Sequence, residues 1–397
     1  MLDTVSGRKL GVAIVGIGGA VATTAVAGIE LLKRGANRLD GLPLQDCVVA
    51  GMAMYRDMVF GGWDLSGDDL SQAASTHRVL THEQIADVGP ALAATKPWPA
   101  IGSGDFCRKV DGANKREFAG HRAAIDAITE DLHKFRRDSG ADGLVMINLA
   151  STESWPDDTS PYMSVEAFEH ALDSDHPAIG PAMLYAYAAI RAGVPYGNFT
   201  PSLAAEIPAL KELAKQHNVP VAGKDGKTGQ TMIKTVLAPA LRSRALHVDG
   251  WFSTNILGNR DGQALQDPAS LRSKLNTKGN VLDSILGYPV EDHIVDIRYY
   301  RPRGDDKEAW DNIDVSGFLG QRMQIKVNFL CKDSILAAPL VLEIARVLDL
   351  AQQRGDGGVQ EQLGLFFKAP MMANGNAPEH AFHAQERQLM EWLAVDA

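Results

Sequence analysis

The chain contains few cysteines. Its 397 residues include three, Cys47, Cys107 and Cys331, and these lie far apart. An odd number of widely separated cysteines excludes a disulfide framework, and the spacing does not match that of a zinc site. Free thiols are typical of a reducing compartment, so we expect a cytoplasmic protein.

The sequence also lacks concentrated charge of one sign. It has no run of five or more like charges, and 49 acidic residues against 39 basic ones leave a net charge of −10. Proteins that bind nucleic acid usually present a basic face, so the composition predicts no nucleic-acid partner. The length and the 45% share of hydrophobic residues predict an ordinary globular chain of two or three domains.

No segment has the continuous apolar character of a membrane span. Residues 10–29 come nearest, since they carry no charge and follow Arg8 and Lys9. They contain five glycines and two adjacent threonines, however, and no leucine-rich core. The pattern favours a buried strand, LGVAIVG, a glycine turn and a helix that ends at Lys33-Arg34-Gly35. We therefore predict no membrane association.

A complete nucleotide-triphosphate loop is missing as well. In the stretch VAGKDGKTGQTMIKT, Gly226-Lys227-Thr228 match the end of the motif G-x-x-x-x-G-K-[ST]. Val221, however, occupies the position where the motif needs its first glycine. What remains is a glycine-rich turn before a probable helix, QTMIKTVLAPAL. The N-terminus of a helix favours an anion of any kind.

Short apolar segments alternate with helical patterns in the first half of the chain. The strand candidates are VAIVG, CVVAGMAM (47–54) and GLVMINLA (143–150), with helices expected in HRAAIDAITEDLHKF, AMLYAYAAIRAG and EIPALKELAKQHN. This order predicts an α/β fold with helices on both faces of a parallel sheet. From about residue 245 the strands LHVDGWFS, EDHIVDIRYYR and QRMQIKVNFL alternate with period two and predict a more open sheet, before a long helix at 334–353.

The turn in VAIVGIGGAVATT has the context of a dinucleotide-binding site. Gly16, Gly18 and Gly19 lie between a buried strand and a helix, where glycines let a pyrophosphate approach the backbone. Val21 occupies the third glycine position of G-x-G-x-x-G, so the strict fingerprint is broken. A carboxylate near the end of the second strand should hold the ribose, and the candidates are Asp57 and Asp64. A tight turn without ligand is the alternative, and we favour NAD.

Four lysines after residue 270 could form a cationic site: Lys274, Lys278, Lys307 and Lys368. Singly, each is expected to be a solvated surface residue. Together they would suit a phosphorylated sugar, because lysines can hold a phosphate and stabilise a developing enolate or alkoxide. Crowded ammonium groups also lower one another's pKa, so that one can act as a base.

Acidic and amide residues cluster in STNILGNRDG, where Asn255, Asn259 and Asp261 surround a turn. Local turn chemistry alone can explain such residues. His380 and His383 lie near the C-terminus without a third ligand, so we expect no metal there.

These motifs together resemble the myo-inositol-1-phosphate synthase family. The pieces are VGIGG, FGGWD, INLASTE, YAYAAIRAGVPYGNFTPS, AGKDGKTGQT, NILGNRDG, RSKLNTK, GDDK, KDSILAAPL and FFKAPM. The match runs along most of the chain, and its YAYAA, NFTPS, GKDGKTG and FFKAPM segments are most similar to the archaeal-type branch.

The resemblance implies a fold and an assembly. Residues 1–231 with 333–397 would form an NAD-binding Rossmann-type domain, and residues 232–332 an inserted α+β domain for catalysis and homotetramer formation. The GKDGKTGQT segment would then be a cofactor-side loop.

The resemblance also implies a reaction. NAD would oxidise the C5 hydroxyl of glucose 6-phosphate, enolisation and aldol closure would form the carbocycle, and the hydride would return to C5. Lys274 would move the proton at the C5 oxygen, while Lys278, Lys307 and Lys368 would hold phosphate and stabilise the enolate and aldolate. Asp261 and Asn255 would orient the nicotinamide, the lysines or a cation. The implied cofactor-binding residues are Gly16, Ile17, Gly18, Gly19, Ala20, Val21, Asp64, Ala150, Ser151, Thr152, Asp225, Thr228, Asn259, Asp305, Asp333 and Ser334.

Some residues depart from the family pattern. Asn259 and Lys332 stand where carboxylates are expected, and Arg260 adds positive charge, which leaves open whether a divalent or monovalent cation is used. These changes also leave open another sugar phosphate, such as fructose 6-phosphate, as the substrate. A non-catalytic NAD-binding scaffold is a third reading, which the presence of all four lysines disfavours.

Overall fold

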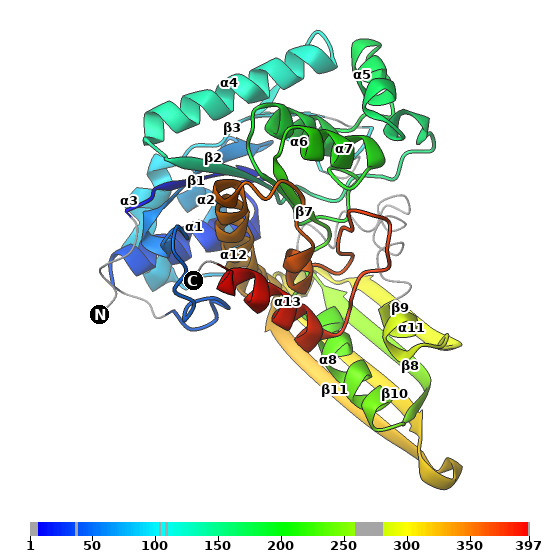
Figure 1. Cartoon of the computed structure of the whole chain (residues 1–397). Coiled ribbons are helices and arrows are strands. Elements are labelled where there is room, and N and C mark those ends of the chain that lie inside the picture. Colours follow the sequence, from blue (N-terminus) through cyan, green and yellow to red (C-terminus); the bar gives the residue numbers. More distant parts are fainter. Residues whose placement is uncertain (1–6, 36–38, 103–104, 108–109, 259–280, 396–397) are drawn as a thin grey trace.

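The computed structural model describes residues 7–35, 39–102, 105–107, 110–258 and 281–395. Within them, eight strands form one large sheet (Figure 1). These are β1 (Leu10–Val15), β2 (Met58–Asp64), β3 (Trp98–Ile101), β4 (Lys115–Arg116), β5 (Gly143–Asn148), β6 (Tyr196–Asn198), β7 (Pro220–Gly223) and β12 (Gly358–Val359). Neighbouring strands pair in parallel in the order β12-β7-β6-β5-β1-β2-β3-β4.

Helices cover both faces of this sheet, as the sequence predicted. On one side lie α1 (Ala20–Lys33), α2 (Leu70–His77), α3 (His82–Ala94) and α12 (Asp333–Arg354); on the other lie α4 (His121–Ser139), α5 (Val165–Asp173), α6 (Pro181–Arg191) and α7 (Pro208–Gln216) (Figure 1). The side chains of β1 alternate between the two cores: Val12 and Ile14 face α1 and α12, whereas Ala13 and Val15 face α4 and α6. Because both faces are buried, the strand is continuously apolar.

The uncharged segment 10–29 divides into β1, the glycine turn and α1, as expected. Helix α1 ends at Lys33, followed by Gly35 with φ +67°. Among the helices that the structure describes, none is long and apolar enough to cross a membrane.

The predicted strand at 47–54 is wrong. Those residues are irregular, with a turn at Ala50-Gly51 in which Gly51 has φ +81°, and the second strand is β2, which follows a 3₁₀ turn at Tyr55–Asp57. The glycines of β2 obscure its strand pattern, but close packing requires them. A Cβ on Gly62 would lie 1.9 Å from the Ile14 carbonyl oxygen, and one on Gly61 would lie 2.7 Å from the Trp98 ring.

The second sheet comes from later residues and has the order β11-β10-β8-β9. Its strands are β8 (His247–Leu257), β9 (Asp292–Tyr299), β10 (Asp306–Ser316) and β11 (Arg322–Lys332), and α8 (Gln230–Ser243) and α11 (Val281–Leu286) pack on one face. The sequence predicted three of these strands and missed β10, whose acidic and amide residues weaken the apolar alternation. In Figure 1 this sheet extends away from the large one as an arm.

The end of the chain returns to the large sheet. Helix α12 packs against α1 and β5, and α13 (Phe382–Ala394) contacts the 3₁₀ helix at Glu361–Phe366. The other 3₁₀ turns are at Ser160–Tyr162, Arg301–Arg303 and Phe318–Gly320. The mixed α/β fold with its large parallel sheet confirms the predicted fold class.

Candidate active site

A cleft of about 690 Å³ opens at the carboxyl ends of β1 and β5. Strands β1 to β4 follow one another toward one edge of the sheet, and β5 to β7 follow one another toward the other edge. The strand order therefore reverses between β1 and β5. Ligands of open parallel sheets bind at such a switch point. The lining residues include most of those predicted to bind a cofactor: Gly16, Gly19, Ala20, Val21, Asp64, Ala150, Ser151, Thr152, Asp225, Thr228, Asp305, Asp333 and Ser334.

The glycine turn lies against the segment that follows β5. Gly16 has φ +86°, and a Cβ there would come within 3.1 Å of the Ala150 backbone. Helix α1 begins at Gly19 with no side chain capping its first N–H groups. Such an uncapped N-terminus at a cleft can receive the pyrophosphate of a dinucleotide. Ile17 is fully buried, so its part in the turn is to anchor it in the core.

Asp64 is the carboxylate at the end of the second strand. Its Oδ2 accepts the Gly18 N–H at 2.9 Å, and its Oδ1 accepts the Ser66 N–H at 2.9 Å. The carboxylate is therefore held beside the turn, where a ribose hydroxyl can donate to it. Asp57 precedes β2 and lies at the opposite end of the strand, which leaves Asp64 as the candidate.

Sequence reasoning missed His77, which also lines the cleft. Its Nε2 lies 2.8 Å from the Gly18 carbonyl oxygen, so the last turn of α2 contacts the glycine turn. A lone histidine at the end of a short helix gives no motif that would have identified it.

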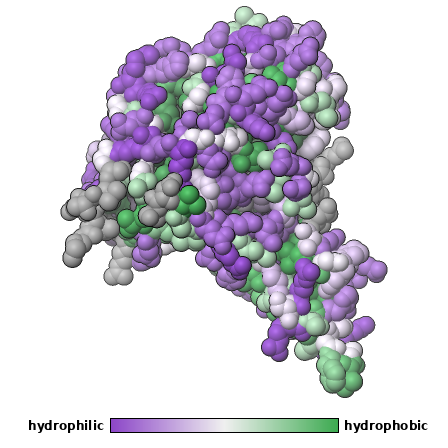
Figure 2. Space-filling view, in the orientation of Figure 1, coloured by the Kyte–Doolittle hydropathy of each residue, from purple (hydrophilic) through white to green (hydrophobic). Residues whose placement is uncertain are grey.

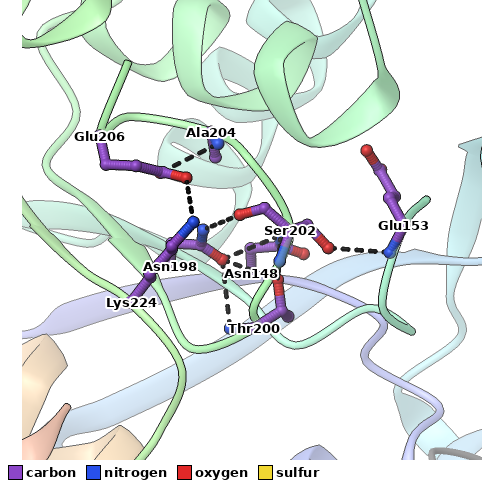
Figure 3. A network of polar contacts seen from close by, with 8 residues as sticks. All are labelled: Asn148, Glu153, Asn198, Thr200, Ser202, Ala204, Glu206 and Lys224. Carbon is purple, nitrogen blue, oxygen red and sulfur yellow. Dashed lines mark hydrogen bonds and ion pairs between the residues drawn. The ribbon is translucent and has the colours of Figure 1, made fainter. Parts of the chain in front are cut away.

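Buried polar side chains join the ends of β5 and β6 (Figure 3). Asn148 accepts the Ala150 N–H at 3.1 Å and donates to the side chain of Asn198 at 3.3 Å. Thr200 donates to the same Asn198 oxygen at 2.9 Å. These bonds hold Ala150, Ser151 and Thr152 at the cleft.

Lys368 reaches the cleft as half of a buried ion pair. Its Nζ lies 2.7 Å from Asp225 Oδ1, and the two side chains are 10% and 5% exposed. Its backbone N–H also donates to the Asp225 carbonyl at 2.7 Å. The expectation that Lys368, taken singly, is a solvated surface lysine is wrong, because two distant segments pair around it.

Lys307 enters the cleft from the second sheet. Its Nζ is 3.3 Å from Asp333 Oδ1, which also accepts the Thr228 hydroxyl at 2.9 Å. At the start of α12, the Ser334 hydroxyl donates to Asp305 at 2.7 Å. Two lysines and three carboxylates thus line the same cleft as the dinucleotide turn: Lys307, Lys368, Asp225, Asp305 and Asp333. This combination fits a redox cofactor together with an anionic substrate.

Comparison of the sequence and the fold with those of known proteins shows the family of this chain. The family model described as Myo-inositol-1-phosphate synthase matches residues 41–394. The chain belongs to the myo-inositol-1-phosphate synthase family. This is an NAD-binding family. The match confirms the resemblance seen in the sequence motifs and the prediction of NAD as the cofactor.

Individual relatives match over nearly the whole chain. Inositol-3-phosphate synthase 1 of Bacteroides thetaiotaomicron is 39% identical and covers 97% of this chain and 95% of its own length. Isozyme 1 of Arabidopsis thaliana is 30% identical over 96% of this chain and 84% of that protein. The solved inositol-3-phosphate synthase from Caenorhabditis elegans has a TM-score of 0.92 at 26% identity, covering 98% of this chain and 86% of that chain.

Some residues that the synthase resemblance assigned are not described. Lys274, Lys278, Asn259 and Asp261 lie outside the described residues, so their roles stay predictions. Asn255 is described and buried, and its amide donates to Gln230 on α8. It is absent from the cleft lining of the described residues, and its role in orienting the nicotinamide, the lysines or a cation stays a prediction.

The sequence also missed lysines that are buried near the cleft. Burial lowers the pKa of Lys227 to about 7, and its Nζ lies 2.5 Å from Gln385 on α13. Burial likewise lowers the pKa of Lys234 to about 8, where it contacts His293 at 2.8 Å beneath the second sheet. Both residues occur in the segment 221–235, whose third lysine, Lys224, is buried as well, and no pattern in the sequence indicates this burial.

The described residues contain no group of three His, Cys, Asp or Glu side chains that could hold a metal ion. Of the two C-terminal histidines, His380 is buried, which lowers its pKa to about 4, and His383 contacts Glu386 on its own helix. Lys332 lies 3.2 Å from Asp306.

Proposed function

We propose that this synthase-family chain converts glucose 6-phosphate to inositol phosphate without net oxidation or reduction. The observation that carries the proposal is the meeting of Lys307 and Lys368, each paired with a carboxylate, in the cleft of the dinucleotide turn. A high identity to inositol-3-phosphate synthases over nearly the full chain supports it.

Bound NAD would supply oxidation at C5 and would return the hydride there at the end. The chain itself would bind the substrate and stabilise oxygen charge. Lys307 and Lys368 present ammonium groups to the substrate oxygens, where they favour the enolate and the aldolate. Asp225 and Asp333 hold those ammonium groups in place. Lys274 is assigned proton transfer at the C5 oxygen and Lys278 phosphate binding, on the resemblance alone.

The test is a reaction of the purified protein with NAD and glucose 6-phosphate, with and without EDTA. Phosphorus NMR, and mass spectrometry after dephosphorylation, should identify an inositol phosphate, with no NADH accumulating. Loss of activity in EDTA would assign a required cation. Consumption of fructose 6-phosphate with no inositol formed would refute the proposal and show that the cleft serves another substrate.

We propose that the protein is a homotetramer joined through its second sheet. The face of this sheet opposite α8 carries exposed apolar side chains, among them Ile294 (48% exposed), Trp310 (38%) and Leu330 (61%). Phe318 and Leu319 at the β10–β11 connection are also exposed, and Figure 2 shows apolar residues gathered at that end of the arm. Apolar patches of this kind mark protein–protein interfaces. Light scattering after size exclusion measures the assembly.

The division of the chain into domains is proposed on the same basis. Residues 1–231 with 333–397 contribute the large sheet and its helices, and 232–332 contribute the second sheet. A cytoplasmic location is proposed from the cysteines, since Cys47, Cys107 and Cys331 form no disulfide with one another.

A further inference from the structure

Glu153 is a buried carboxyl group in the wall of the cofactor cleft. It ends the segment 149–153, which follows β5 and lines the cleft from Leu149 onward. The residue is 8% exposed, although glutamate is seldom buried without a specific partner. The roles described above for the lysines and for Asp225 and Asp333 do not involve it.

The Glu153 side chain binds the start of α6. Its Oε1 accepts the Ala182 N–H at 2.9 Å. Helix α6 has Gly180 as its N-cap and Pro181 at its first turn, and no side chain of its own caps it. Glu153 therefore supplies a cap from a segment 29 residues earlier in the chain. Gly180 leaves room for it, because a Cβ there would lie 2.7 Å from Glu153 Oε2.

The Glu153 backbone is bound to a different element. Its N–H donates to the Ser202 hydroxyl at 3.0 Å, and the Ser202 N–H donates to Thr200 Oγ1 at 3.2 Å. Figure 3 shows that Ser202 and Thr200 belong to the same network as Asn148 and Asn198, while the Glu153 side chain points away from it. One residue thus ties the cleft segment to α6 and to the chain that follows β6.

We propose that Glu153 is a positioning residue for the cofactor: its two contacts set where the backbone of residues 150–152 meets the bound dinucleotide. The inference rests on the proposed function, because it takes NAD as the occupant of the cleft. A helix cap alone would stabilise α6. A positioning residue must also change the affinity for NAD, since misplaced backbone groups bind the cofactor less well.

The charge of Glu153 offers a second readout. Its pKa is raised to about 8: burial is the main cause, the hydrogen bond from the Ala182 N–H opposes the shift, and the nearby Glu206 adds to it. Glu206 is itself paired with Lys224 at 3.0 Å, and among the described residues Tyr162 and Tyr196 also interact electrostatically with Glu153. Glu153 is therefore neutral at pH 7 and adds no negative charge to the cleft that would bind NAD. Above pH 8 it ionises, and the affinity for NAD should fall.

Isothermal titration of the apo protein with NAD tests this without relying on turnover. Glu153→Ala should weaken NAD binding about tenfold, the effect of losing a buried hydrogen bond of about 1.4 kcal/mol. Glu153→Gln keeps the acceptor oxygen and should bind NAD as the wild type does at pH 7. It should also lose the weakening above pH 8. Gly180→Ala should weaken binding with Glu153 intact, because the new Cβ displaces the carboxyl group.

Ser164→Ala is the matched control. Ser164 caps α5 by accepting the Ala167 N–H at 3.2 Å and does not line the cofactor cleft. It should lower the melting temperature and leave NAD affinity unchanged. If Glu153→Gln and Gly180→Ala both bind NAD as the wild type does, at pH 7 and at pH 9, the inference is wrong. If the wild type itself does not bind NAD, the proposed function fails with it.

Discussion

The buried pair of Asp225 and Lys368 should be strongly coupled in stability. Both side chains are nearly excluded from solvent at a separation of 2.7 Å. Removing one partner takes the opposite charge at 2.7 Å away from a buried group, so Asp225→Asn and Lys368→Met should each cost about 3–5 kcal/mol in the free energy of unfolding. The double variant removes both charges and should cost no more than either single one. The coupling energy should therefore reach about 3 kcal/mol.

Urea unfolding followed by circular dichroism measures the four free energies, provided that the slopes with denaturant agree. The exposed pair of Lys115 and Asp111 is the matched control. It has a similar geometry, 3.0 Å, but its side chains are 40% and 74% exposed, so solvent screens the charges and its coupling should be far smaller than that of the buried pair. Additive costs at the Asp225–Lys368 pair would refute the reasoning. Lys368→Met and the double variant should both lack synthase activity, since each removes the ammonium group from the cleft.

Three further changes should have the following results. Gly62→Ala should destabilise the protein by about 3 kcal/mol or more, because its Cβ would meet the Ile14 carbonyl at 1.9 Å, whereas Gly28→Ala has nothing within 4 Å and should be tolerated in a thermal melt. Lys227→Met should stabilise the protein at pH 7, because the unfolded lysine keeps its ordinary pKa near 10.5 and binds more protons than the folded one. That gain should shrink as the pH rises from 7 to 10 in unfolding measurements, and a constant difference would contradict it. Trp310→Glu should lower the mass measured by light scattering if the second sheet joins subunits, and an unchanged mass would place the interface elsewhere.

The sequence predicted well those helices and strands whose own residue pattern is enough to identify them. β1 is buried on both faces and reads as continuously apolar, and α4 and α7 show a clear helical period. β2 could not be found this way, because Gly61 and Gly62 are required by side chains and backbone of other strands. The sequence pattern did not reveal β10 for a related reason. Its buried Asp311 is satisfied by Trp251 at 2.7 Å and Ser253 at 2.6 Å, partners that only the folded sheet supplies.

The candidate site divides in the same way. The glycine turn and Asp64 could be predicted because a local motif and the end of a strand mark them. Lys307 and Lys368 were among the lysines proposed from the sequence as a cationic site, and the family resemblance implied their roles. Their pairing with Asp333 and Asp225 depends on the tertiary structure and could not be predicted. Glu153 was missed, since its role depends on the start of α6, which no local pattern connects to it.

The apparent phosphate loop at 221–235 shows how packing can imitate a motif. Gly226 is needed because a Cβ there would lie 2.0 Å from the Phe199 ring. Lys227 does not line the cleft, as a phosphate-binding lysine would; it contacts Gln385 instead. Asp225 does line the cleft, and its φ of +58° lets its carbonyl and its carboxylate both bind Lys368. A turn with a carboxylate at this point repels a triphosphate and holds an ammonium group, so the same glycines and lysine serve a different chemistry.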